Sequence, residues 1–79
     1  MKNIYLRIEH LNAKNEILYS EYHGALMDKN YIYFDKYKIK KADTEEHDEK
    51  DKSMKDRATR CIKLQGVSKR NDPRFTRAD

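Results

Sequence analysis

Cys61 is the side chain with the greatest nucleophilic potential, because it is the only cysteine among the 79 residues. Arg60 and Lys63 lie beside it in the sequence, and neighbouring cations lower the pKa of a thiol and raise its reactivity. A lone cysteine in a predicted strand is more commonly a small packed side chain. The sequence therefore predicts no catalytic residue, and a thiol-dependent enzyme or small nuclease is the alternative.

The histidines and glycines do not form a recognisable site. His10, His23 and His47 are scattered, whereas a zinc site needs four ligands at close, paired spacing. His47 lies among carboxylates that could bind a divalent ion weakly, but a solvated acidic loop is the simpler interpretation. Gly24 and Gly66 are isolated, which excludes a glycine-rich phosphate loop. We therefore predict that the protein is not an enzyme, holds no metal ion and needs no cofactor.

Tyrosines and lysines are interleaved through residues 31–41, a pattern that suits nucleic-acid binding. Bases stack on exposed aromatic rings while lysines neutralise the phosphate backbone. The alternative is that the tyrosines pack a small core and leave their hydroxyls at the surface. The candidate partner-binding residues in this segment are Tyr31, Tyr33, Tyr37, Lys36, Lys38 and Lys40.

Residues 68–79 form a basic tail that could hold phosphates or an acidic groove. Arginine and aromatic side chains are favoured at interface hot spots, although tails of this kind are usually solvated unless they dock. The candidate partner-binding residues in the tail are Lys69, Arg70, Arg74, Phe75 and Arg77. A third candidate is the acidic run at 43–56, whose carboxylates could imitate nucleic-acid phosphates on a basic partner.

Length and composition limit what these residues can build. A chain of 79 residues makes one domain with a thin core, and a possible homodimer would enlarge that core. Only 37% of the residues are apolar and 41% are charged, with a net charge of +4. Residues 43–56 carry seven acids and three lysines, so a basic body surrounds one acidic segment. No apolar run is long enough for a signal peptide or a membrane span, so we expect a cytoplasmic protein without membrane contact.

The first half of the chain predicts two strands. Residues 3–9 alternate apolar and polar side chains, which is the signature of a half-buried strand. Residues 11–16 contain two asparagines and predict a turn. Residues 17–23 predict a second strand, with a helix as the alternative, and 28–30 predict another turn.

The second half is more varied. Residues 31–40 predict one strand that carries Tyr31, Tyr33 and Tyr37 on the same face. Residues 41–56 lack an apolar period and predict a mobile acidic loop. Residues 59–64 predict a further strand, although a short helix over 54–65 is the alternative because Met54, Ala58 and Cys61 recur at helical spacing.

The predicted fold is mainly β, or α+β, with a small antiparallel sheet of 3–5 strands. One β-rich domain spans 1–67, including the loop at 43–56, and the basic tail spans 68–79. We predict a small regulatory protein or inhibitor that binds a larger host protein or nucleoprotein complex. The alternative is a module that binds DNA or RNA. Abundant Lys, Ile, Tyr and Asn are typical of AT-rich genomes, including those of bacteriophages and mobile elements.

Overall fold

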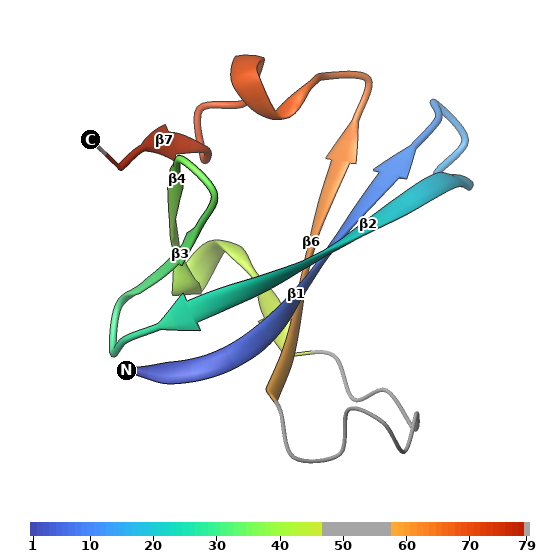
Figure 1. The fold of residues 1–79 in the computed structure, drawn as a ribbon. Helices are drawn as coiled ribbons and strands as arrows, with labels where there is room; N and C mark the ends of the chain where they lie inside the picture. The colour runs from blue at the N-terminus through green and yellow to red at the C-terminus, as the bar shows by residue number, and fades with distance from the viewer. Residues whose placement is uncertain (47–57, 79) are drawn as a thin grey trace.

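The fold is one curled sheet of seven strands, and its computed structural model describes residues 1–46 and 58–78 (Figure 1). The strand order is β5-β6-β1-β2-β3-β4-β7. The strands are β1 (Lys2–Leu11), β2 (Ile17–Met27), β3 (Tyr31–Phe34), β4 (Tyr37–Lys40), β5 (Glu45–Glu46), β6 (Ala58–Gln65) and β7 (Thr76–Arg77). The mainly β prediction is confirmed. The expected 3–5 strands were too few, and the sheet is mixed because β1 and β6 run parallel.

The predicted strands at 3–9 and 17–23 are confirmed as β1 and β2, which pair antiparallel along their full length. Ile4, Leu6 and Ile8 alternate into the core, as the period of two requires. The asparagine turn between the strands is also confirmed. The Asn12 side-chain carbonyl accepts hydrogen bonds from the backbone N–H groups of residues 14 and 16 at 2.9 and 3.0 Å.

The prediction of one strand over 31–40 is wrong, because a two-residue turn at Asp35 and Lys36 divides it into β3 and β4. Asp35 has a φ of 51°, the left-handed conformation that tight hairpin turns need at such positions. Phe34 pairs with Tyr37 across this hairpin, so the two rings share a face. Tyr37 is therefore buried in the core and lies on the face opposite Tyr31 and Tyr33.

The core lies on the inner face of the curl and receives one ring from the C-terminal segment. Its buried members are Ile4, Leu6, Ile8, Ala25, Ile32, Phe34, Tyr37, Ile39, Ile62, Leu64 and Phe75. Phe75 is 6% exposed and meets Phe34 and Tyr37 edge to face, with ring centroids 6.1 and 5.8 Å apart. The basic segment therefore docks on the sheet through an aromatic anchor.

The strand expected at 59–64 is confirmed as β6, and the helical alternative is wrong for residues 58–65. The loop predicted at 41–56 is wrong for residues 41–46, the part that the structure describes. A 3₁₀ turn occupies Lys41–Asp43, and β5 pairs with β6 through Glu45 and Glu46. Residues 47–57, which include most of the predicted acidic loop, lie outside the described residues.

Arg60 fixes the path from β4 to β5. Its guanidinium donates to the Thr44 hydroxyl at 2.7 Å and to the Thr44 carbonyl at 3.1 Å. This connection brings the chain in a few residues from β4, the neighbour of the edge strand β7, to β5 at the opposite edge of the curled sheet (Figure 1). Within 1–46 and 58–78, no helix has the length and apolar character needed to cross a bilayer.

Candidate functional site

Two grooves beside β7 collect most of the predicted partner-binding cations. The larger, of about 510 Å³, is lined by Tyr31, Lys38, Lys40, Arg74 and Arg77 among others. The smaller, of about 350 Å³, is lined by Lys36, Tyr37, Arg70, Phe75 and Arg77. Because Arg77 belongs to both, the grooves are adjacent. We call their cations the basic band: Lys36, Lys38, Lys40, Arg70, Arg74 and Arg77.

The basic band exists because a hairpin and the C-terminal segment meet at one sheet edge. β7 pairs with β4 through Tyr37 with Arg77 and Lys38 with Thr76. The buried Phe75 ring precedes β7 and holds it against the sheet. The backbone N–H of residue 78 donates to the carbonyl of Lys36 at 2.9 Å, which extends the pairing to the hairpin turn. Segments that are thirty or more residues apart in sequence thus form one surface.

Tyr31 supplies an aromatic ring to the larger groove. The Lys38 ammonium lies 4.1 Å from the centroid of this ring, a cation–π contact that places positive charge beside a partly exposed aromatic surface. Asp43 is the acidic residue that lines this groove among the described residues. The groove therefore combines an aromatic ring with an excess of positive charge.

Arg74 is held in place more firmly than the lysines. Its guanidinium donates to both carboxylate oxygens of the buried Asp72, at 3.0 and 2.8 Å, and to the carbonyl of Lys63 on β6 at 2.6 Å. The hydrogen bond from Arg74 lowers the pKa of Asp72, against the effect of burial. Arg74 thus links the C-terminal segment to β6, and its charge is partly balanced by Asp72.

Three predicted site residues have other roles in the structure. Lys69 donates to the Glu21 carboxylate at 2.6 Å, and this ion pair ties the C-terminal segment to β2. Tyr33 donates its hydroxyl to Asp28 at 3.0 Å. This contact raises the pKa of Tyr33, while backbone N–H groups of the turn lower that of Asp28. Phe75 was predicted as a surface anchor, and its ring instead fills the core.

Sequence reasoning missed the polar cluster around Glu21. His10 and His23 both contact its carboxylate, at 2.5 and 3.2 Å, in addition to Lys69. Although burial alone would raise the pKa of Glu21, these three hydrogen bonds lower it from 4.5 to about 2. The observed register places Glu21 opposite the buried Ile8 and so on the core face; the predicted hairpin carried no register and could not show this. A carboxylate on a core face needs partners.

Cys61 has none of the features of an activated thiol. It is buried, and burial together with the nearby Glu9 carboxylate raises its pKa to about 11. Arg7, its pairing partner on β1, and Lys63 oppose this shift with smaller effects. Within residues 1–46 and 58–78, no three or more His, Cys, Asp or Glu side chains are arranged so that they could hold a metal ion, and His47 falls outside these residues.

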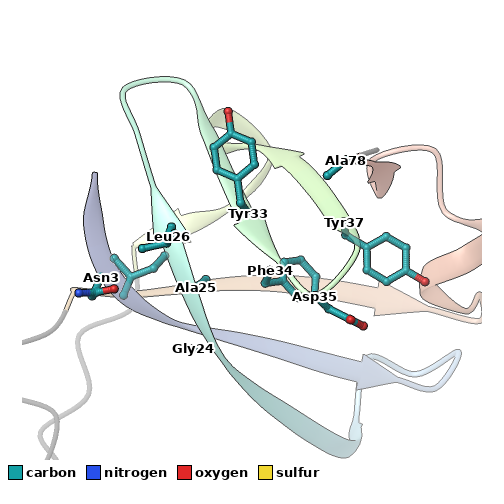
Figure 2. Close-up of a pocket in the computed structure, with 10 residues that line it drawn as sticks. Asn3, Gly24, Ala25, Leu26, Tyr33, Phe34, Asp35, Tyr37 and Ala78 are labelled. Atoms are coloured by element: carbon teal, nitrogen blue, oxygen red, sulfur yellow. The ribbon is translucent and has the colours of Figure 1, made fainter.

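A further cavity, of about 630 Å³, lies where β2 separates from the β3–β4 hairpin (Figure 2). Gly24 and Ala25 line it from β2, while Phe34 and Asp35 line it from the hairpin. None of its lining residues is a cation of the basic band, although it shares Tyr37 with the smaller groove and Ala78 with the larger one. No protein-family model, curated protein or solved structure matches this chain.

Proposed function

We propose that this protein acts without catalysis, by binding an anionic surface on a larger partner, either a host protein or a nucleoprotein complex. The observation that carries the proposal is the basic band, in which six cations from β4, the β3–β4 turn and the C-terminal segment gather around one strand. Sequence charge alone is weak evidence for a partner, whereas a contiguous patch raises the local potential and speeds association with an opposite charge.

The distribution of charge supports a directed interaction. The basic band lies at the β7 edge of the sheet, and the exposed Glu45 and Glu46 lie on β5 at the other end of the strand order. The acidic groups beside the basic band are Asp43, which lines the larger groove, and Asp72, which binds Arg74, so positive charge remains in excess there. A partner that approaches β7 meets mainly positive charge, which suits carboxylate or phosphate groups.

The most reactive groups support a role without chemistry. Cys61 is buried with a raised pKa, and the Glu21 carboxylate accepts hydrogen bonds from His10 and His23 beside the docked C-terminal segment. These side chains contribute to packing and to the position of Lys69. A thiol-dependent activity would require a thiolate that burial of Cys61 disfavours.

A second candidate function is binding of single-stranded DNA or RNA, which Tyr31 favours. Its partly exposed ring lies in a groove with Lys38, Lys40 and Arg77. Stacking of one base on such a ring contributes about 1–3 kcal/mol, and it tolerates any base. The lysines would neutralise the phosphates on either side.

Affinity capture with charge-reversal variants tests the proposal. The double variant Lys38→Glu and Arg77→Glu reverses two cations of the basic band. The control, Lys2→Glu and Lys14→Glu, makes the same change of charge at exposed positions outside it. Wild type and control should recover the same partner from a candidate host lysate, and the band variant should lose it.

Nuclease treatment of the lysate separates the two candidate functions. A protein partner that survives the treatment supports the first, and recovery that depends on intact nucleic acid supports the second. Equal recovery by the band variant and the wild type would refute both, because each requires the basic band.

A further inference from the structure

β2 has a long edge that no neighbouring strand covers within the described residues. β1 pairs with β2 along its whole length, but β3 pairs only with Leu26 and Met27. Residues 17–25 therefore have one neighbouring strand, and the hairpin diverges from them where the cavity of Figure 2 begins. We call the side of residues 17–25 that faces away from β1 the open edge.

The alternation of backbone hydrogen bonds along β2 determines which backbone groups face the open edge. The N–H of Asp28 donates to the carbonyl of Tyr31 at 3.0 Å, so residue 28 directs its backbone toward β3. In an antiparallel ladder every second residue does the same. Ser20, Tyr22 and Gly24 thus direct their N–H and C=O groups to the open edge, while Glu21 and His23 direct theirs to β1.

The open edge has few of the features that usually prevent strands from pairing between molecules: a register shift at Ile17–Tyr19 and the inward-pointing Glu21. Natural edge strands are short or carry lysine, proline or inward-pointing charges. Residues 17–25 contain no lysine, arginine or proline, and Glu21 is already bound by Lys69. Leu18 and Tyr22 are 63% and 50% exposed. By contrast, β5 and β7 have two residues each and carry charged side chains.

We propose that two copies of this chain pair through their open edges, antiparallel about a twofold axis at Ser20. In this register Leu18 lies opposite the second copy's Tyr22 in both halves, which joins exposed apolar side chains. The ring of Tyr22 also meets the Arg7 guanidinium at 5.8 Å, and this contact lies within one copy. The dimer extends the sheet across both molecules and is independent of the basic band.

Other registers are less favourable. An axis at Glu21 would place the two Glu21 carboxylates opposite each other, where like charges repel. An axis at Tyr22 would place Leu18 opposite Leu26, whose backbone is already paired with β3. The Ser20 register separates the carboxylates and uses only the open edge. Since edge pairing buries less area than a standard interface, the dimer should depend on concentration.

Sedimentation equilibrium over a wide concentration range tests the proposal. The wild-type mass should rise from 9.5 kDa toward twice that value as concentration increases. Ser20→Pro removes one N–H that faces the open edge and none that bonds β1, so it should remain at the monomer mass. Ser20→Ala keeps the N–H and should dimerise like the wild type. Circular dichroism checks that both variants are folded.

Leu18→Lys provides a second route if Ser20→Pro does not fold, because it places a charge at an exposed edge position. It should also lower the dimer fraction. Cross-linking tests the register: Ser20→Cys should form a disulfide-linked dimer under mild oxidation, because paired Cα atoms across such an axis lie within disulfide reach. Thr76→Cys, on β7, is the control.

A wild-type mass of 9.5 kDa at every concentration would overturn the proposal. It would also be overturned if a folded Ser20→Pro variant dimerised like the wild type, or if Ser20→Cys and Thr76→Cys cross-linked equally. None of these results would bear on the basic band, because β7 lies at a different edge of the sheet.

Discussion

Replacing Phe75 by alanine should destabilise the whole domain, although this residue lies only four positions from the C-terminus. The ring is 6% exposed and packs against Phe34 and Tyr37. Truncation of a buried phenylalanine typically costs about 3–5 kcal/mol. The domain as a whole should have a free energy of unfolding of roughly 4–12 kcal/mol for its size.

Urea denaturation followed by circular dichroism measures this effect. Phe75→Ala should lose about 3–5 kcal/mol of unfolding free energy, and its melting temperature should fall by at least ~12 °C. Phe75→Leu is the matched control, because it keeps most of the apolar volume and loses mainly the edge-to-face contacts. It should cost only about 1–1.5 kcal/mol.

A loss below about 0.5 kcal/mol for Phe75→Ala, the size of a neutral surface change, would refute the reasoning. The C-terminal segment would then be undocked, and the two grooves that define the basic band would not be assembled. The same variant should therefore also weaken partner capture.

Two further predictions concern ionisable groups. The pKa of Glu21 is about 2 in the fold and 4.5 without its partners, so its charge stabilises the protein above pH 4.5 and this contribution is lost as pH falls toward 2. Because Glu21 is partly exposed, we expect its charge to contribute about 1–2 kcal/mol to the free energy of unfolding. The free energy of unfolding should therefore depend less steeply on pH in Glu21→Gln than in the wild type. An unchanged slope would contradict this prediction. The pKa of Cys61 is raised to about 11, so native protein at pH 8 should react with iodoacetamide roughly a hundredfold more slowly than urea-unfolded protein. Equal rates would show that the thiol is accessible.

Strand alternation was the most reliable guide in the sequence. It located β1 and favoured a strand for β6, because apolar side chains at every second position must face a core. β2 was also located, but most of its large apolar side chains are exposed and its core face carries Glu21, His23 and Ala25. The hairpin at Asp35 was missed because Asp-Lys lacks the glycine or asparagine that usually marks a two-residue turn. Such a turn shifts the alternation by one residue, which moved Tyr37 from the predicted surface face to the core.

The residues of the candidate site could be identified from the sequence, but their assembly into one surface could not. The lysines near Tyr31 and the arginines near the C-terminus were each identified, but nothing in the sequence indicated that they lie together. Their contact depends on one buried ring, Phe75, and a single aromatic residue has no period to detect. The pairing of β6 with β1 is parallel and non-local, so neither local propensity nor turn chemistry could specify it.

Amide chemical-shift mapping on uniformly ¹⁵N-labelled protein tests the central claim most directly. Oligothymidylate and poly-L-glutamate serve as the two anionic probes, one for each class of partner. At least one of them should shift the amides of Tyr31, β4, Arg70 and β7, and these shifts should disappear in the Lys38→Glu and Arg77→Glu double variant. Shifts centred on β1, β2 or β6, or no shifts with either probe, would contradict the assignment of the basic band as the binding surface.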